Sequence, residues 1–308
     1  MIALLLIPLL VPWAAPALAR RVLDRCPPVA ALWTLTVSAL LLAGGSVAAL
    51  GTLALTGLLK IPAFAALGEL VHPLRTPSER LVLPIAALAA GLLVLAALTL
   101  GLSLVRQTAG LRTARAQAGR RPAAGDLCVV DSPRPDAYAL PGRPHRIVVT
   151  TAMLRSLDAP EREALFAHER AHNSGGHHYF LATAELAAHC HPALRPVREA
   201  IRLAAERAAD EAAATAVGDR HLTARAIARA ALATTGQDAV RPTVTPAATT
   251  GPVPRRVAAL LTPARHARAV PFIAALLATC AVLSCATAAT GAFRVHEDIE
   301  IAQGETTG

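Results

Sequence analysis

Four long apolar stretches constrain this chain more than any other feature of its sequence. They cover about residues 2–19, 30–59, 81–105 and 265–293. Each is close to the roughly 20 residues that an α-helix needs to cross a lipid bilayer. Hydrophobic residues make up 54% of the chain, which exceeds the share found in ordinary soluble domains. The sequence therefore predicts a mainly α membrane protein with four transmembrane helices.

Arginine clusters at the ends of these stretches indicate how the chain is oriented. They lie at residues 20–25, 106–121 and 265–268, and one arrangement of four spans brings all three to the same side. Because such residues favour the cytoplasmic side, we predict a multi-pass protein of the plasma membrane with both termini extracytoplasmic. The short acidic tail, residues 294–308, would then lie outside. In an alternative interpretation, 17-ALA-19 is a signal-peptidase site, and removal of the first stretch would reverse this orientation.

The net charge of +9 comes mostly from arginine. Because the arginines flank apolar runs, they are explained as topology signals rather than as contacts to phosphates. We therefore expect the lipid bilayer as a partner and no nucleic acid.

The polar region between the third and fourth stretches is large enough for one small domain. We place this domain at residues 122–264, after a membrane part at residues 1–121. Two short β-branched runs predict strands, and four segments with helical patterns follow them. The strands are 127–132 and 146–151, the helices are 158–173, 179–190, 196–218 and 222–235, and residues 236–254 form a linker rich in Pro and Thr. We therefore expect an α+β domain, which is cytoplasmic in the orientation above.

The first of these helices has clear end signals and carries an H-E-x-x-H motif, His168 to His172. Asp158 suits the N-cap, Glu161 can close a capping box, and Gly175-Gly176 ends the helix. Two histidines four residues apart project from one helical face, as zinc ligands do. Glu169, beside His168, can then act as general base toward a water activated by zinc. The motif predicts a zinc metalloendopeptidase with one Zn²⁺ per chain.

The third protein ligand has two candidates. The longer metzincin pattern would use His178, but that class needs a methionine turn downstream, and both methionines of this chain precede the motif. We favour Glu206, which lies four residues before Asp210 on one face of an alanine-rich helix. Asp210 would accept a hydrogen bond from a ligand imidazole and fix its tautomer. His177 and His178 are then expected to cap the glycine turn or line the cleft.

The segments AYALPG, RIVVTTAMLRSL, FAHERAH and AERAADEAA, in this order, resemble the membrane-embedded gluzincin peptidases. The nearer branch is the BlaR/MecR-type metallopeptidases, with the HtpX-like peptidases as a relative. The resemblance implies a zincin-like domain in which His168, His172 and Glu206 bind zinc and Glu169 is catalytic. It also implies that the segment with Tyr138 is an edge strand beside the cleft, where an extended substrate could pair.

The chain departs from the antibiotic-sensing members of that family, because residues 294–308 are too few for an extracellular penicillin-binding sensor domain. Direct β-lactam sensing is therefore not expected. The resemblance favours regulatory proteolysis of a cytoplasmic or membrane-associated protein, for example a transcriptional repressor. The alternatives are an HtpX-like quality-control protease and a non-catalytic transducer that keeps a structural zinc site. A structural site would need a fourth protein ligand, for which Cys190 is the candidate.

Overall fold

The computed structural model describes residues 2–61, 64, 79–121, 123–235, 252–262 and 270–303. Three sequence predictions fall wholly or mostly outside these residues. They are the arginine pair at 265–268, the linker at 236–254 up to residue 251, and the last part of the acidic tail, residues 304–308.

Four helical segments of the described chain are long and apolar enough to cross a membrane, which supports a membrane protein. The first consists of α1 (Ile2–Leu10), a 3-10 turn η1 (Val11–Ala14) and α2 (Ala15–Arg25). The others are α3 (Pro28–Leu58), α5 (Glu79–Gly119) and α12 (Val270–Gln303). The first segment is broken because its prolines cannot donate the backbone hydrogen bonds of a continuous helix.

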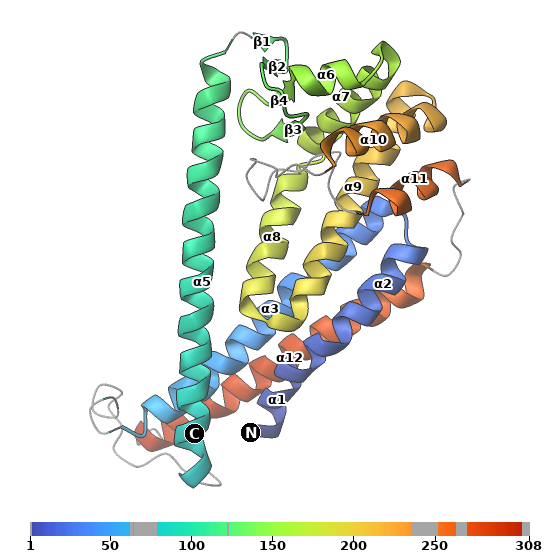
Figure 1. The fold of residues 1–308 in the computed structure, drawn as a ribbon. Coiled ribbons are helices and arrows are strands. Elements are labelled where there is room, and N and C mark those ends of the chain that lie inside the picture. Colours follow the sequence, from blue (N-terminus) through green and yellow to red (C-terminus); the bar gives the residue numbers. More distant parts are fainter. Residues whose placement is uncertain are drawn as a thin grey trace.

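Helix α3 lies at the centre of the bundle and contacts α1, α5 and α12 (Figure 1). Glycines allow these contacts to be close. A Cβ atom on Gly45 would lie 2.9 Å from Ser284 Oγ of α12, and one on Gly57 would lie 2.1 Å from the Cβ of Ala86 on α5. Small residues at such positions bring two helix backbones together where lipid gives no hydrophobic driving force.

Helix α5 is much longer than the predicted span of residues 81–105. It continues without a break to Gly119, so Arg106, Arg112 and Arg115, which were expected in a loop, lie on the helix. Arg120 and Arg121 directly follow it. Its 41 residues correspond to about 60 Å, roughly twice the thickness of the hydrocarbon core. The last turn covers one face of a small sheet, where Ala118 packs with Cys128 and Val148.

The sheet contains β1 (Ala123–Ala124), β2 (Leu127–Val130), β3 (Ala137–Leu140) and β4 (Arg146–Thr150), in the order β1-β2-β4-β3. Strand β4 is parallel to β2 and antiparallel to β3, which leaves β3 at an edge. Helices α6 (Thr151–Ser156) and α7 (Ala159–Ser174) follow. They cover the other face, where Val149, Met153 and Leu165 form a small core.

The remaining helices are α8 (His177–Cys190), the 3-10 turn η2 (Pro192–Leu194), α9 (Arg195–Val217), α10 (Arg220–Thr234) and α11 (Val253–Leu261). Helix α11 begins where the sequence analysis predicted the end of a linker. It lies against α9 and α10.

The hairpin formed by α8, η2 and α9 packs against the candidate spans. Leu35 of α3, Leu181 of α8 and Ile201 of α9 belong to one buried cluster. At the hairpin tip, His191 Nε2 lies 3.1 Å from the carbonyl oxygen of Leu9, and Trp13 contacts the His191 ring edge-on. The tip therefore lies beside the middle of the first candidate span.

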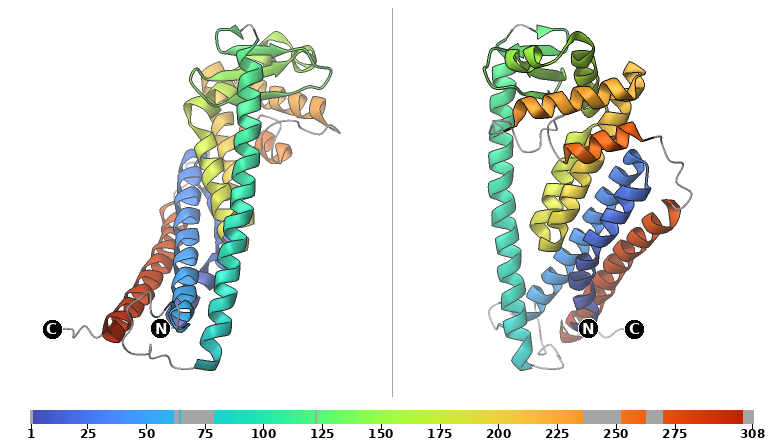
Figure 2. Two further views of the ribbon diagram at one scale, coloured as in Figure 1. Left: turned by 90° about the vertical axis from the view of Figure 1, so that its left-hand side faces the viewer. Right: turned by 45° about the vertical axis from the view of Figure 1, so that its right-hand side comes forward.

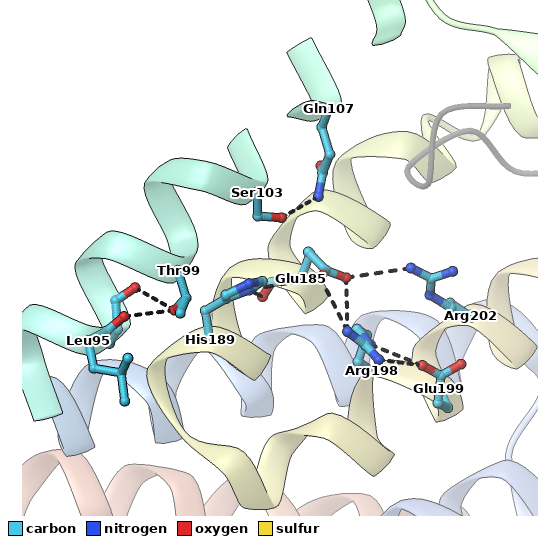
Figure 3. A network of polar contacts seen from close by, with 10 residues as sticks. Leu95, Thr99, Ser103, Gln107, Glu185, His189, Arg198, Glu199 and Arg202 are labelled. Atoms are coloured by element: carbon cyan, nitrogen blue, oxygen red, sulfur yellow. Dashed lines mark hydrogen bonds and ion pairs between the residues drawn. The ribbon is translucent and has the colours of Figure 1, made fainter. Parts of the chain in front are cut away.

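Charged side chains on this hairpin are paired with one another (Figure 3). Glu185 accepts hydrogen bonds from Arg198 Nη1 at 3.2 Å and Arg202 Nη2 at 3.5 Å. Ser103 and Gln107 of α5 line a cavity of about 260 Å³ together with Glu185. Pairing reduces the cost of placing charge beside apolar helices.

Different elements lie at the two ends of the molecule. The start of α1 and the end of α12 lie at one end, and the sheet, α7 and α10 lie at the other (Figures 1 and 2). The end of α2, with its arginines, lies toward the sheet end, where Arg207 of α9 donates a 2.6 Å hydrogen bond to the Leu23 carbonyl oxygen.

Candidate metal centre

The start of α7 is fixed by the capping box that the sequence predicts. Asp158 Oδ1 accepts a hydrogen bond from the Glu161 backbone N–H at 2.9 Å, and Glu161 Oε2 accepts one from the Asp158 N–H at 3.0 Å. Glu161 is fully buried and also accepts a 2.8 Å hydrogen bond from Arg229 Nη1 of α10. Burial by itself would raise the pKa of Glu161, but these donors hold that pKa below its usual value. The helix that carries the motif is therefore held at its start and ends at Gly175.

The structure brings His168, His172 and Glu206 together. His168 Nε2 lies 3.0 Å from His172 Nε2. Glu206 Oε2 lies 3.5 Å from His168 Nε2, and Glu206 Oε1 lies 3.6 Å from His172 Nε2. The two histidines are 0% exposed and Glu206 is 3% exposed. Within the described part of the chain, this is the group of His, Cys, Asp and Glu side chains whose spacing could hold a metal ion.

These three side chains fit Zn²⁺. Ligands at 2.0–2.1 Å from a tetrahedral ion lie about 3.3 Å from one another, which is close to the three separations observed here. Two imidazole nitrogens and one carboxylate oxygen are also a donor set found in catalytic zinc sites, where the fourth position stays open.

Asp210 and Arg256 contact the ligand side chains and hold them in place. Asp210 Oδ1 lies 3.0 Å from His168 Nδ1, on the ring side away from Glu206. Arg256 of α11 donates to Asp210 through Nε at 2.8 Å and Nη2 at 2.6 Å, and its Nη1 lies 3.0 Å from Glu206 Oε2. Its side chain is fully buried. One guanidinium therefore holds two carboxylates of α9 in fixed positions.

The charges in this cluster shift several pKa values. Burial would raise the pKa of Glu206 and Asp210, but Arg256 and the neighbouring histidines together lower both pKa values and keep the two carboxylates ionised. Burial lowers the pKa of His168, but its contacts with Asp210 and Glu206 raise it to about 9. A metal ion would have to displace that proton, because only a neutral imidazole nitrogen is a ligand.

His177 fixes the other ligand imidazole. Its Nδ1 lies 2.7 Å from His172 Nδ1, so one of these atoms donates and the other accepts. Burial and the neighbouring histidine lower the pKa of His177 to about 3, so His177 is neutral at physiological pH. If His177 is the acceptor, His172 carries its proton on Nδ1 and its Nε2 is free to bind a metal.

Glu169 is fully buried beside the cluster, and its charge is among those that raise the pKa of Arg256, against the effect of burial. Cys190, the candidate for a fourth ligand of a structural site, lies at the opposite end of α8 from His177. It packs against the apolar cluster between α2, α3 and α9. The described residues therefore place no cysteine at the His168, His172 and Glu206 group.

The two residues predicted as possible cleft residues, His178 and Tyr138, lie on α8 and β3. His178 is half-buried, and burial together with the charges of His145 and Arg115 lowers its pKa. Tyr138 packs on the face of the sheet that α5 covers.

Sequence reasoning missed Arg256 and the contact made by His177. Arg256 was one of many arginines and lies 46 residues from Asp210 in the chain. Its signal in the sequence is weak, because it is one of two adjacent arginines on a short helix after a Pro-rich segment. His177 was noticed, but spacing alone could not distinguish it from His178.

Comparison with known proteins gives one result. The model of Peptidase family M48 matches residues 105–191, from the second half of α5 to the end of α8. No curated protein and no solved structure matches the chain. The matched range contains His168, Glu169 and His172, while Glu206 lies beyond it. With the buried His/His/Glu group that could hold a metal, this match supports a zinc metallopeptidase of family M48.

Proposed function

We propose that this protein is a membrane-embedded zinc endopeptidase that hydrolyses peptide bonds of cytoplasmic or membrane-associated proteins. The observation that carries the proposal is the buried group of His168, His172 and Glu206 with Glu169 on the same helix as the two histidines. A catalytic zinc site needs these ligand types and an acid–base group beside them.

In this mechanism His168, His172 and Glu206 hold the ion, and each protein group has one task. When bound, zinc supplies a Lewis acid that polarises the substrate carbonyl and favours ionisation of the attacking water. Glu169 accepts a proton from that water as the new C–O bond forms. It then gives a proton to the amide nitrogen as the C–N bond breaks. Asp210 and His177 keep the ligand imidazoles in the required tautomers.

Strand β3 supports binding of an extended substrate. It is an edge strand of the sheet, and it contacts α7, the helix that carries the motif. An extended peptide added along an edge strand gains main-chain hydrogen bonds in regular register. We infer that the substrate pairs with β3 and runs along α7.

We further propose that the protein crosses the plasma membrane four times with the sheet end in the cytoplasm. In support, the end of α2 and the last turns of α5, which carry arginines, lie toward this end, and the start of α1 and the end of α12 lie at the other (Figure 1). The resemblance to BlaR/MecR-type peptidases favours regulatory proteolysis, for example of a transcriptional repressor. An HtpX-like quality-control role is the second candidate, with the same chemistry and a wider set of substrates.

The test compares two full-length variants in lipid nanodiscs. Glu169→Gln removes the proposed proton acceptor, and Glu163→Gln changes an exposed residue of the same helix. We expect Glu169→Gln to keep one zinc per chain and lose peptide cleavage, while Glu163→Gln keeps both. Unchanged cleavage by Glu169→Gln would refute the mechanism, and bound zinc with no cleavage by the wild type would favour a non-catalytic transducer.

A further inference from the structure

A pocket of about 290 Å³ lies beyond the end of β3, between the last turns of α5 and the turn that joins β3 to β4. Its lining contains three arginines from three different segments: Arg115 of α5, Arg143 of the turn and Arg146 of β4. Among the described residues that line it, none carries a carboxylate. Its volume is at the lower end of the roughly 300–1,000 Å³ typical of small-molecule sites, which is enough for one side chain.

The framework of this pocket is fixed. Arg115 Nε donates a 2.8 Å hydrogen bond to the Pro141 carbonyl oxygen, which ties the turn to α5. Arg146 Nη1 donates to the Ala118 carbonyl oxygen at the end of α5. Arg143 is exposed. The guanidinium groups of Arg115 and Arg146 therefore have one bond each to a carbonyl oxygen and keep further N–H groups for a ligand.

The lining of the pocket is connected to α7, the helix that carries His168 and His172. Asn173, which directly follows His172, donates a 3.2 Å hydrogen bond to the Arg146 carbonyl oxygen. On the other side, His178 directly follows His177 and is close enough to Arg115 for that charge to affect it. A substrate strand paired with β3 would pass from α7 toward these arginines.

An anionic lipid headgroup is a poor occupant for this pocket. The apolar part of α5 ends at Arg106, and Arg115 lies nine residues further along, which is about 14 Å of helix. Headgroups extend only about 5–8 Å beyond the hydrocarbon core. The acidic residues near the end of α12 are also excluded, because they lie at the opposite end of the molecule (Figure 1).

We propose that the pocket formed by Arg115, Arg143 and Arg146 is a specificity subsite that binds the carboxylate of an Asp or Glu side chain in the substrate. This inference rests on the proposed peptidase function. It predicts cleavage next to acidic positions, on the side of the scissile bond that lies toward the end of β3. Paired guanidinium groups favour a carboxylate through charge-assisted hydrogen bonds.

The test uses the full-length protein in nanodiscs and one fluorogenic peptide scaffold. Glu, Gln or Lys is placed in turn at each position on both sides of the scissile bond. We expect Glu to raise kcat/KM roughly tenfold over Gln at one position, mainly through KM. Arg143→Glu should remove this preference and improve the Lys peptide, whereas Arg155→Glu, an exposed arginine on α6, should behave as wild type.

Direct binding separates this inference from the proposed function. The Glu169→Gln protein is titrated with the same labelled peptides, and fluorescence anisotropy reports affinity without cleavage. Tighter binding of the Glu peptide, lost in Arg143→Glu, supports the subsite even if no peptide is cut. Equal affinities for the Glu, Gln and Lys peptides at every position would overturn it, whether or not the wild type is a peptidase.

Discussion

Arg256 Nη1 lies 3.0 Å from Glu206 Oε2, and both side chains are buried. The same guanidinium donates hydrogen bonds to Asp210. Helix α11, which precedes the fourth candidate span in the chain, therefore positions two carboxylates on α9. Three charges of this kind are stable in the interior only as a paired set. The metal centre is therefore completed by a segment outside the region that carries the motif.

Replacing Arg256 should destabilise the protein and weaken zinc binding. Arg256→Met leaves Glu206 and Asp210 buried without their cation, at a cost of about 3–5 kcal/mol. Thermal unfolding in nanodiscs and zinc content would measure the two effects. Arg255→Met is the matched control, because Arg255 is exposed and pairs with the exposed Asp24 at the end of α2. If both variants unfold at the same temperature, Arg256 does not have this role.

His177 should matter for zinc affinity, and His178 should not. Loss of the partner that orients a ligand imidazole typically weakens metal binding 10- to 100-fold. We expect this loss in His177→Ala, with partial recovery in His177→Gln, and a wild-type zinc affinity in His178→Ala. Competition with a fluorescent chelator would measure all three. A zinc loss confined to His178→Ala would instead favour the metzincin arrangement.

The metal-free protein should lose stability as the pH rises from neutral toward 9. The pKa of His168 is raised to about 9 in the folded state, above its ordinary value of 6.5. Such a group contributes stability that is fully present below pH 6.5 and is lost as pH rises through 9. Asp210→Asn removes one cause of the shift and should flatten this dependence. Zinc affinity should change in the opposite sense and increase with pH, because the ion competes with the proton on His168. The unfolding midpoint of the chelator-treated protein should fall as the pH is raised from 6 to 9, and a midpoint that rises would contradict this prediction.

The paired charges on the α8–α9 hairpin should contribute to stability according to burial. Glu185 has a side chain only 12% exposed and Glu199 one that is 60% exposed, and both accept a hydrogen bond from Arg198. Double-mutant cycles with Arg198→Gln should give a coupling of about 1–2 kcal/mol for Glu185 and about 0–1 kcal/mol for Glu199. Equal couplings would show that the hairpin is equally hydrated at both positions.

Local patterns predicted much of the fold around the motif. The capping box of Asp158 and Glu161, the end of α7 at Gly175 and the strands β2 and β4 all depend on neighbouring residues, so the sequence contains their signals. The approach of Glu206 to the two histidines could be predicted as well, because each helix carried its polar residues four apart on one face.

Features that depend on distant packing could not be predicted in this way. The apolar run of α5 ends near Val105, but alanine, arginine and glutamine favour a helix without being apolar, so the helix continues to Gly119. Residues 177–205 mix alanines with charges and read as helices of a soluble domain. Their position beside α3 follows from contacts that no local pattern records. The same is true of Arg256.

The ligand set of the bound metal tests the account most directly. Zinc X-ray absorption spectra would be recorded for the full-length protein and for Glu206→Gln, with Glu211→Gln of the same helix as control. We predict one zinc per chain with two histidine nitrogens, oxygen ligands and no sulfur. We also predict loss of the ion in Glu206→Gln alone. A sulfur ligand in the wild type, or the same zinc content and spectrum in Glu206→Gln, would contradict the account.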